Sequence, residues 1–281
     1  MKRGLVLEGG AMRGMFTCGV LDVFMEEGIS FDGAVGVSAG ATFGCNIKSR
    51  QIGRALRYNR KYCGDKRYCS WSSWFRTGDL YNVSFCYDEL PYKLDRWDIK
   101  AFKENPMEFY CVATDVETGK AVYHKCTTGQ KDDIIWIQAS ASMPVFSRPV
   151  KIEGGKYLDG GMSDSIPLKF MEDQGYDQIL VIETQPLEYR KEPQKHMGII
   201  GLFLSKYPKM IETMRNRYLM YNEEKDYIRQ QEELGNVLVI RPKEPLHIGA
   251  MEKNKDNLQR VYDLGRVAAK EFLKKKTWVN E

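Results

Sequence analysis

The sequence has no long apolar run. No stretch of about 18 consecutive apolar residues occurs, the length that a membrane-spanning helix needs. The first apolar segment, after Lys2 and Arg3, is short and ends at two glycines, unlike the apolar core of a signal peptide. The formal net charge is only +4 over 281 residues, so no nucleic-acid partner is expected. The composition, 43% hydrophobic and 28% charged, is that of a folded globular protein, which we expect in the cytoplasm.

The cysteines form no pattern that would hold the fold together. They number seven and include no Cys-x-x-Cys pair. They are Cys18, Cys45, Cys63, Cys69, Cys86, Cys111 and Cys126. Scattered thiols of odd number argue against a disulfide framework and against a zinc site. The sequence therefore predicts reduced thiols and no metal.

Histidine is scarce, which limits the chemistry open to a serine nucleophile. The chain has three histidines, His124, His196 and His247, and none stands in a turn typical of a catalytic histidine. We interpret each as structural or exposed. A Ser-His-Asp triad is therefore not expected, and a serine nucleophile would need a carboxylate as its base. Such a base must be desolvated or otherwise tuned to work near neutral pH.

The N-terminal segment has the pattern of a parallel α/β fold. Residues 4–7 form a short apolar run that ends at Gly9 and Gly10, which predicts a buried strand entering a tight loop. Apolar residues then recur at helical spacing over 15–27, and residues 31–37 form a second apolar run. Strand, loop, helix and strand in this order begin a βαβ unit with a parallel sheet.

The rest of the chain divides into a core and a C-terminal extension. The predicted elements are an exposed helix in 50–67, an irregular aromatic section at 68–92, hairpins at 109–124 and 149–158, a helix at 132–143, a helix from Pro167 to a cap at Gly175, a strand at 178–183, a long helix at 196–234, a strand at 237–240 and a basic C-terminal helix. We expect a catalytic domain at 1–190 and a helical extension at 191–281 packed on the same domain.

The segment Gly36-Val37-Ser38-Ala39-Gly40 is a Gly-x-Ser-x-Gly motif. It lies after a predicted strand and before a predicted helix, which is the setting of a nucleophile elbow. Small neighbours permit a sharp turn that lifts the serine hydroxyl above the sheet edge, and the helix start directs free amides toward developing negative charge. The alternative is a plain turn with a solvent-facing serine.

Asp159 is the candidate base. It stands in Asp159-Gly160-Gly161 directly after a predicted strand, where two glycines allow close approach of another backbone. The alternative for this tripeptide is a simple turn. A competing carboxylate, Asp115, follows the strand of the first hairpin and ranks well below Asp159.

A glycine-rich loop joins the first strand and the first helix. It reads Gly9-Gly10-Ala11-Met12-Arg13-Gly14, and its backbone amides can stabilise the oxyanion that forms when serine attacks an ester. The alternative is a dinucleotide-binding loop, but the Gly-x-Gly-x-x-Gly fingerprint needs glycine where Ala11 stands. Arg13 adds charge or orients the loop.

The order and spacing of four motifs over residues 3–185 resemble the patatin-like phospholipases. The motifs are the loop ending at Arg13-Gly14, Gly-Val-Ser-Ala-Gly at 36–40, Ala-Ser-Ala-Ser-Met-Pro at 139–144 and Asp159-Gly160-Gly161. The resemblance implies a three-layer α/β/α fold with a mostly parallel central sheet, a Ser-Asp dyad, and no metal or organic cofactor. On this resemblance Ser38 is the nucleophile, Asp159 is the base, and the oxyanion loop is Gly9, Gly10, Ala11, Met12 and Arg13, supported by Gly14, Gly36, Gly40, Gly160 and Gly161.

The resemblance has one departure and leaves rival functions open. Ala11 stands where the family commonly has a third glycine, and alanine disfavours a positive φ. The expected activity is hydrolysis of carboxylic esters of phospholipids, lysophospholipids or related lipids. The alternatives are an acyltransferase that uses the same acyl-enzyme, a catalytically silent lipid-binding scaffold, and a nucleotide-binding module. The sequence makes no prediction of oligomeric state.

Two apolar segments raise the hypothesis of peripheral contact with the inner membrane face. Trp71, Trp74 and Phe75 lie between basic residues, and residues 198–204 form an apolar run followed by lysines and arginines. Ordinary packing over the acyl pocket or core is the interpretation that we favour for both segments.

Overall fold

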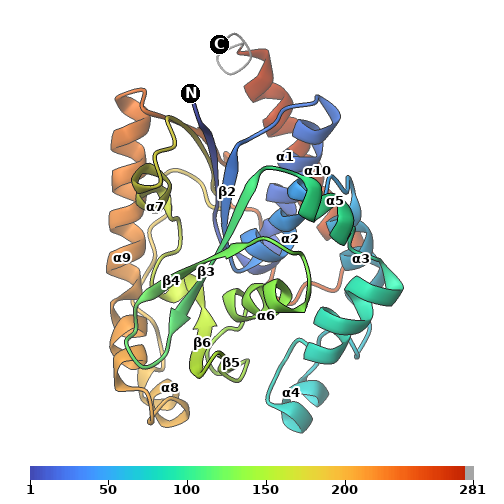
Figure 1. Cartoon of the computed structure of the whole chain (residues 1–281). Helices are drawn as coiled ribbons and strands as arrows, with labels where there is room; N and C mark the ends of the chain where they lie inside the picture. The colour runs from blue at the N-terminus through green and yellow to red at the C-terminus, as the bar shows by residue number, and fades with distance from the viewer. Residues whose placement is uncertain (276–281) are drawn as a thin grey trace.

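A computed structural model describes residues 1–275, which form an eight-stranded sheet with helices on both faces (Figure 1). The strand order is β5-β6-β3-β2-β1-β7-β8, with β4 paired to β3. The strands are β1 (Arg3–Leu7), β2 (Gly33–Val37), β3 (Glu108–Asp115), β4 (Ala121–Cys126), β5 (Val150–Ile152), β6 (Gly155–Asp159), β7 (Gln178–Ile182) and β8 (Val237–Ile240). β1, β2, β3, β7 and β8 are parallel, whereas β4, β5 and β6 join in antiparallel pairs. The prediction of a mostly parallel sheet is confirmed.

Alternate residues of each central strand face different helical layers. In β1, Leu5 and Leu7 pack in a core with one set of helices, and Val6 packs in a separate core with another set. The first layer contains α1 (Gly14–Glu26), α2 (Ala39–Lys48), α3 (Arg54–Tyr62), α6 (Lys131–Ser140) and α10 (Lys255–Lys274); the second contains α7 (Leu168–Asp173) and α9 (Pro208–Glu233). Burial of both sheet faces explains why the central strands are continuous apolar runs. The three-layer α/β/α prediction is confirmed.

The aromatic section is more regular than the sequence predicts. Residues 68–92 are not irregular: they contain α4 (Trp71–Thr77) and most of a π-helical segment, η2 (Phe85–Leu94). The Ser70 side chain caps α4 by accepting a hydrogen bond from the Ser73 amide. Short, aromatic-rich helices without a repeating apolar face give little periodic signal, which explains the error. A further helix, α5 (Ile99–Glu104), was not predicted.

Two predicted helices differ from their expected form. The long helix at 196–234 is two helices, α8 (Met197–Phe203) and α9, because Pro208 occupies the first turn of α9 and starts a new helix there. The helix within 50–67 is α3, and it is not simply exposed. Arg54 in α3 is buried and donates hydrogen bonds to the Asn46 side chain and the Asp95 carbonyl oxygen.

The C-terminal extension contributes to the sheet as well as to both layers. β8 pairs in parallel with β7, α9 packs on one sheet face, and α10 packs on the other. The last six residues of the predicted extension, 276–281, lie outside the described residues. All seven cysteines are free thiols. No helix within residues 1–275 combines the length and the hydropathy needed to cross a membrane.

Candidate active site

Ser38 occupies a strained turn between β2 and α2. Its backbone has φ 54° and ψ −116°, a region that residues other than glycine rarely adopt. A Cβ added at Gly36 would lie 2.4 Å from the Gly40 carbonyl oxygen, and one added at Gly40 would lie 2.3 Å from the Leu7 carbonyl oxygen. The turn therefore requires glycine at both flanking positions of the motif. This is the geometry of a nucleophile elbow.

The C-terminal end of α6 holds both sides of the site together. The Ser38 amide donates a hydrogen bond of 3.0 Å to Oγ of the buried Ser140, and the Asp159 amide donates one of 2.8 Å to the Ser142 carbonyl oxygen. Both serines belong to the Ala-Ser-Ala-Ser-Met-Pro motif. The sequence marked this motif by resemblance but did not show that it is hydrogen-bonded to both Ser38 and Asp159.

Asp159 ends β6 and is buried. Its carboxylate accepts a hydrogen bond of 2.8 Å from the Gly161 amide, and the Ser38 side chain lies close enough to lower the pKa of the carboxyl. The Thr114 hydroxyl donates to its carbonyl oxygen at 2.8 Å. A Cβ at Gly160 would lie 2.1 Å from the Val112 carbonyl oxygen, so this glycine lets β6 approach β3 closely. The geometry thus places the two predicted dyad residues near each other.

Burial raises the pKa of the Asp159 carboxyl above its ordinary value. The nearby Ser38 side chain, the positive charge of Arg217 and the Gly161 amide each oppose this shift and lower the pKa. Because the net shift is upward, Asp159 is a stronger base than an exposed aspartate. This supplies the desolvation that a serine paired directly with a carboxylate needs.

The glycine-rich loop lies beside Ser38 and presents free amides. Within residues 1–275 the amides of Gly9, Gly10, Ala11 and Met12 make no hydrogen bond, whereas the Arg13 amide donates to the Gly10 carbonyl oxygen at 3.0 Å. Ala11 adopts φ 47°, so the loop keeps the positive φ that the sequence placed in doubt. A positive φ at a residue with a Cβ costs roughly 1–2 kcal/mol. The loop tolerates alanine at the price of local strain.

Gly14 and the amide of Ala39 complete the surroundings of the loop. A Cβ at Gly14 would lie 2.9 Å from the Ala39 Cβ, so this glycine permits the start of α1 to contact the start of α2. The Ala39 amide, directly after the nucleophile, makes no hydrogen bond within the described part of the chain. Loop amides and this helix-start amide can therefore face the same oxyanion.

Glu8 anchors the loop, and sequence reasoning missed it. Its buried carboxylate accepts hydrogen bonds from the Tyr221 hydroxyl of α9, at 2.7 Å, and from the Thr184 amide after β7. Burial raises the pKa of Glu8, and the nearby Arg13 charge partly opposes that shift. The Arg13 side chain donates to the Thr184 hydroxyl at 3.4 Å. The loop is thus fixed to α9 on the far side of the sheet.

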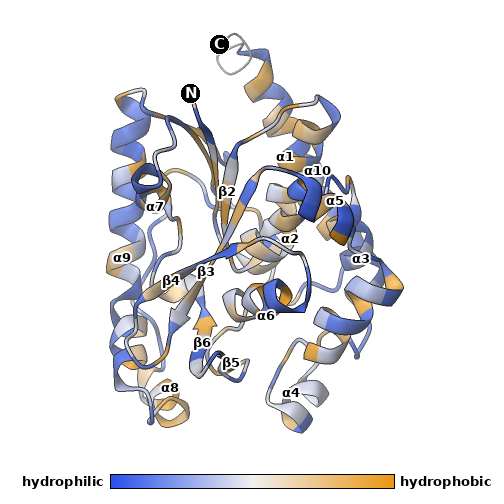
Figure 2. Cartoon of the chain, in the orientation of Figure 1, coloured by the Kyte–Doolittle hydropathy of each residue, from blue (hydrophilic) through white to orange (hydrophobic). Residues whose placement is uncertain are grey.

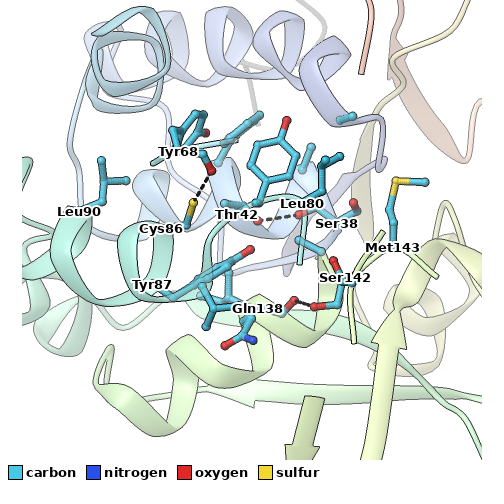
Figure 3. Close-up of a pocket in the computed structure, with 18 of the residues that line it drawn as sticks. Ser38, Thr42, Tyr68, Leu80, Cys86, Tyr87, Leu90, Gln138, Ser142 and Met143 are labelled. Atoms are coloured by element: carbon cyan, nitrogen blue, oxygen red, sulfur yellow. Dashed lines mark hydrogen bonds between the residues drawn. The ribbon is translucent and has the colours of Figure 1, made fainter. Parts of the chain in front are cut away.

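An apolar cavity of about 230 Å³ opens next to Ser38 (Figure 3). Its walls come from α2, α3, η2, α6 and the loop before α10. The lining includes Met12, Thr42, Phe43, Tyr58, Tyr68, Leu80, Tyr87, Leu90, Trp97, Ile134, Ile137, Phe146 and Met251. Burial raises the pKa of Tyr58, Tyr68 and Tyr87, so these side chains stay neutral. The cavity suits an uncharged hydrocarbon chain.

The competing residues lie elsewhere. The Asp115 carboxylate accepts hydrogen bonds from the Glu117 and Thr118 amides and so shapes the turn between β3 and β4. His196 and His247 are exposed, and no histidine lines the cavity.

His124, Cys126 and Asp133 form the set of side chains within residues 1–275 that could hold a metal. Their ligand atoms lie within 4.8 Å of one another. The Asp133 carboxylate already accepts hydrogen bonds from the Thr128 and Gly129 amides. None of the three residues lines the cavity beside Ser38, so we assign no catalytic step to this group.

The chain matches two family models. A model described as patatin-like phospholipase matches residues 5–171, and one described as a domain of unknown function (DUF6363) matches residues 207–277. The uncharacterized protein YjjU of Escherichia coli (strain K12) is 31% identical, over 96% of this chain and 76% of YjjU. The lysophospholipase nte1 of Emericella nidulans is 26% identical over 97% of this chain, which spans 18% of the fungal protein.

A solved structure shares the fold. The crystal structure of VipD from Legionella pneumophila aligns with a TM-score of 0.50 and 14% identity, over 98% of this chain and 67% of VipD. At this identity the likeness is one of fold.

Proposed function

The chain belongs to the patatin-like phospholipase family, a family of lipid hydrolases, and we propose that Ser38 is its nucleophile and Asp159 its general base. The closeness of the Ser38 side chain to the buried Asp159 carboxylate, beside an apolar cavity that Ser38 lines, carries this proposal. Ser38 stands in a strained elbow turn, the Asp159 carboxylate lies beside it, and free amides surround it. This arrangement meets the geometric requirements of acyl transfer.

The reaction runs in two steps. Ser38 Oγ attacks the ester carbonyl carbon while its proton moves to Asp159, and the negative charge on the carbonyl oxygen is held by amides of the glycine-rich loop and of Ala39. Asp159 then gives the proton to the departing alcohol, which leaves an acyl group on Ser38. Water, deprotonated by Asp159, releases the fatty acid and restores the serine.

We propose phospholipids or lysophospholipids as the substrate class. The lining of the cavity is mostly apolar, and its charged member, Arg54, is paired with Asp95, so the cavity accommodates an acyl chain. The fungal relatives are named lysophospholipases, which supports the same class. Water as the final acceptor is part of this proposal; an acyltransferase would pass the same acyl group to an alcohol.

We also propose that an apolar surface around the cavity entrance contacts lipid. Packing over the core was the favoured interpretation of these segments, and it is wrong for several residues: Phe75 and Leu202 are each 77% exposed. Trp74 in α4 and Phe203 in α8 join the two segments, with ring centroids 6.4 Å apart. Figure 2 shows hydrophobic colouring on α8 at the lower edge of the molecule. The exposed members are Trp71, Phe75, Phe146, Ile199, Leu202 and Phe203, and Phe146 also lines the cavity.

Basic side chains border this apolar surface. Lys66, Arg76 and Lys206 are exposed in or next to the same segments. Positive charge beside exposed aromatic residues favours an anionic lipid surface. We expect a Phe75→Ser, Leu202→Ser double variant to lose co-sedimentation with anionic liposomes. Leu264→Ser, which removes another exposed apolar side chain, on α10, should leave co-sedimentation unchanged. Wild-type protein that fails to sediment with such liposomes contradicts this contact.

The domain division and the location are further proposals. We place the catalytic domain at 1–190 and an extension at 191–281 that packs on it; the pairing of β8 with β7 supports this. A cytoplasmic location at the inner membrane face fits the seven free thiols and the exposed apolar surface.

The experiment that tests the function is hydrolysis of p-nitrophenyl esters and lysophospholipids by wild type, Ser38→Ala and Asp159→Asn. We expect turnover by wild type only, with thermal unfolding as the control for folding. Adding a competing alcohol and identifying the product separates hydrolysis from acyl transfer. If the folded wild type turns over no ester, the protein is a silent scaffold or a nucleotide-binding module, and a thermal shift with NAD or ATP identifies the latter.

A further inference from the structure

A second cavity lies on the α9 side of the sheet and has a different chemistry. It measures about 430 Å³ and is lined by residues 189–195 together with Met214, Arg217 and Tyr218 of α9. Its basic members are Arg190, Lys191, Lys195 and Arg217, and Glu192 is the acidic member. A cavity with this lining favours an anion.

Three of these cations, Lys191, Lys195 and Arg217, form no ion pair within residues 1–275, although Glu8 raises the pKa of Lys191 and Asp159 raises that of Arg217. Arg190 forms an ion pair with Asp226 at 2.7 Å, but among the ion pairs of residues 1–275 none involves Lys191 or Arg217. The Lys191 ammonium lies 4.4 Å from the centre of the Tyr221 ring, and Arg217 uses only Nε in a hydrogen bond, to the Gly161 carbonyl oxygen at 2.5 Å. The terminal nitrogens of Arg217 and the ammonium of Lys191 thus remain open to a ligand.

The two cations repel each other. Burial lowers the pKa of Lys191 to about 8, and the charges of Arg217 and Arg13 add to this shift. Burial also lowers the pKa of Arg217, which Asp159 opposes. A bound anion would screen this repulsion and stabilise both charged forms. The electrostatics therefore agree with the geometry.

One residue that lines the basic cavity, Arg217, is linked to the candidate base Asp159 through Gly161. Arg217 is bonded to Gly161, and the Gly161 amide is bonded to Asp159 at 2.8 Å. A Cβ at Gly161 would lie 3.1 Å from Asp159 Oδ1 and 3.3 Å from Arg217 Nη2. The apolar cavity opens from Ser38 toward α2 and α6, and the basic cavity opens toward α9. Ser38 thus lines the apolar cavity, and Arg217, which lines the basic cavity, acts on the charge of Asp159.

We propose that Lys191 and Arg217 form an anion subsite for the phosphate of a lysophospholipid or phospholipid headgroup, whose acyl chain occupies the apolar cavity. The guanidinium of Arg217 offers paired donors that match phosphate oxygens, and Lys191 supplies a second positive charge. This subsite rests on the proposed function, since it orients the ester of the same substrate. Lysophosphatidic acid and monoacylglycerol with one acyl chain differ only in the phosphate, so they isolate its contribution.

The test compares these two substrates in Lys191→Met, with Lys103→Met, an exposed lysine of α5 outside the cavity, as the control and Lys191→Arg as the charge-preserving rescue. We expect kcat/KM for lysophosphatidic acid to fall about 10-fold or more in Lys191→Met, the effect typical of losing a hydrogen bond to a charged group. Monoacylglycerol hydrolysis stays unchanged, and both Lys103→Met and Lys191→Arg retain wild-type selectivity. An equal effect on both substrates, or no effect on either, overturns the subsite.

A binding measurement distinguishes failure of this subsite from failure of the proposed function. Ser38→Ala keeps the cavity, and calorimetric titration with lysophosphatidic acid should show weaker binding when Lys191→Met is added. If wild type hydrolyses neither substrate but this difference persists, the hydrolase proposal fails and the subsite stands. If the difference is absent, the subsite fails whatever the activity. Inorganic phosphate that binds Ser38→Ala as tightly as lysophosphatidic acid contradicts the assignment to a lipid headgroup.

Discussion

The two sides of the Ser38–Asp159 pair are built differently. Toward α2, α6 and η2, the site opens into a mostly apolar cavity whose tyrosines are neutral and whose charged member, Arg54, is paired with Asp95. Toward α9, it meets a row of charged and hydrogen-bonded side chains. Arg217, Tyr221, Glu224 and Lys225 recur at helical spacing on α9 and bond to Gly161, Glu8, Ser165 and Glu183.

This difference shows how one sheet edge can serve two tasks. The apolar side offers mostly hydrocarbon contacts and can hold an acyl chain, whereas the α9 side fixes the glycine-rich loop through Glu8 and the loop after Asp159 through Arg217. An amphiphilic lipid has the same division, with an ester at the junction. We therefore expect the apolar cavity to determine affinity for the acyl chain, and the α9 side to orient the substrate and to set the pKa of Asp159.

The largest expected effect comes from the group that both sides share. Asp159→Asn keeps the size of the side chain but removes the proposed base, so we expect kcat to fall about 10⁴–10⁶-fold for every substrate, the range found when a serine nucleophile loses its base or the residue that orients that base. Steady-state kinetics on short-chain, long-chain and phosphate-bearing esters check this. A loss confined to one substrate class would mean that Asp159 acts in binding.

A change in the apolar side should discriminate by chain length. Cys86 lines the cavity and is half-buried. Cys86→Trp fills part of that volume, and we expect about a 10–100-fold loss of kcat/KM for long-chain esters with acetate esters unaffected. The matched control is Cys86→Ser, which keeps the volume. Equal losses for acetate and long-chain esters would show that the cavity does not hold the chain.

A change in the polar side should alter the pH profile instead. The Arg217 charge lowers the pKa of Asp159, so Arg217→Met raises it further. The base works when ionised; activity is therefore lost as the pH falls through this pKa, and the acidic limb of kcat/KM moves to higher pH. An uncharged p-nitrophenyl ester is the correct substrate, because Arg217 also lines the basic cavity. A downward movement, or an unchanged limb with intact folding, contradicts the proposed coupling.

The smallest effect concerns the loop between the two sides. Ala11→Gly removes the strain of φ 47° but gives the unfolded chain more freedom. We expect a net gain of about 0.5–1 kcal/mol in the free energy of unfolding, measured by urea denaturation. Activity should stay near wild type because the amide is kept. A loss of stability would show that the loop imposes no strain on Ala11.

The sequence predicted the apolar side of the site less well than its centre. Strands β1 and β2 and the three glycine-containing motifs carry local signals, namely continuous apolar runs and glycines at fixed spacing. The cavity walls from α4 and η2 have no clean period, so residues 68–92 were interpreted as irregular. Tyr68, Tyr81 and Tyr87 of this aromatic segment nevertheless line the cavity.

The polar side was missed for another reason. Lys191, Arg217 and Glu8 act through contacts between residues far apart in the chain, such as the bond between Glu8 and Tyr221. A single sequence gives no register between α9 and the sheet edge, so it cannot show which basic residues of a long polar helix turn inward. The spacing of Arg217, Tyr221 and Lys225 was the one available signal, since it places them on one helix face.

The most direct test of the account is the covalent reactivity of Ser38. Wild type and Ser38→Ala are treated with a fluorophosphonate probe, digested and examined by mass spectrometry. We expect one adduct on the peptide that contains Ser38. Asp159→Asn should slow the formation of this adduct, and Ser38→Ala should show none. An unlabelled but folded wild type, or an adduct on another residue that persists in Ser38→Ala, would contradict it.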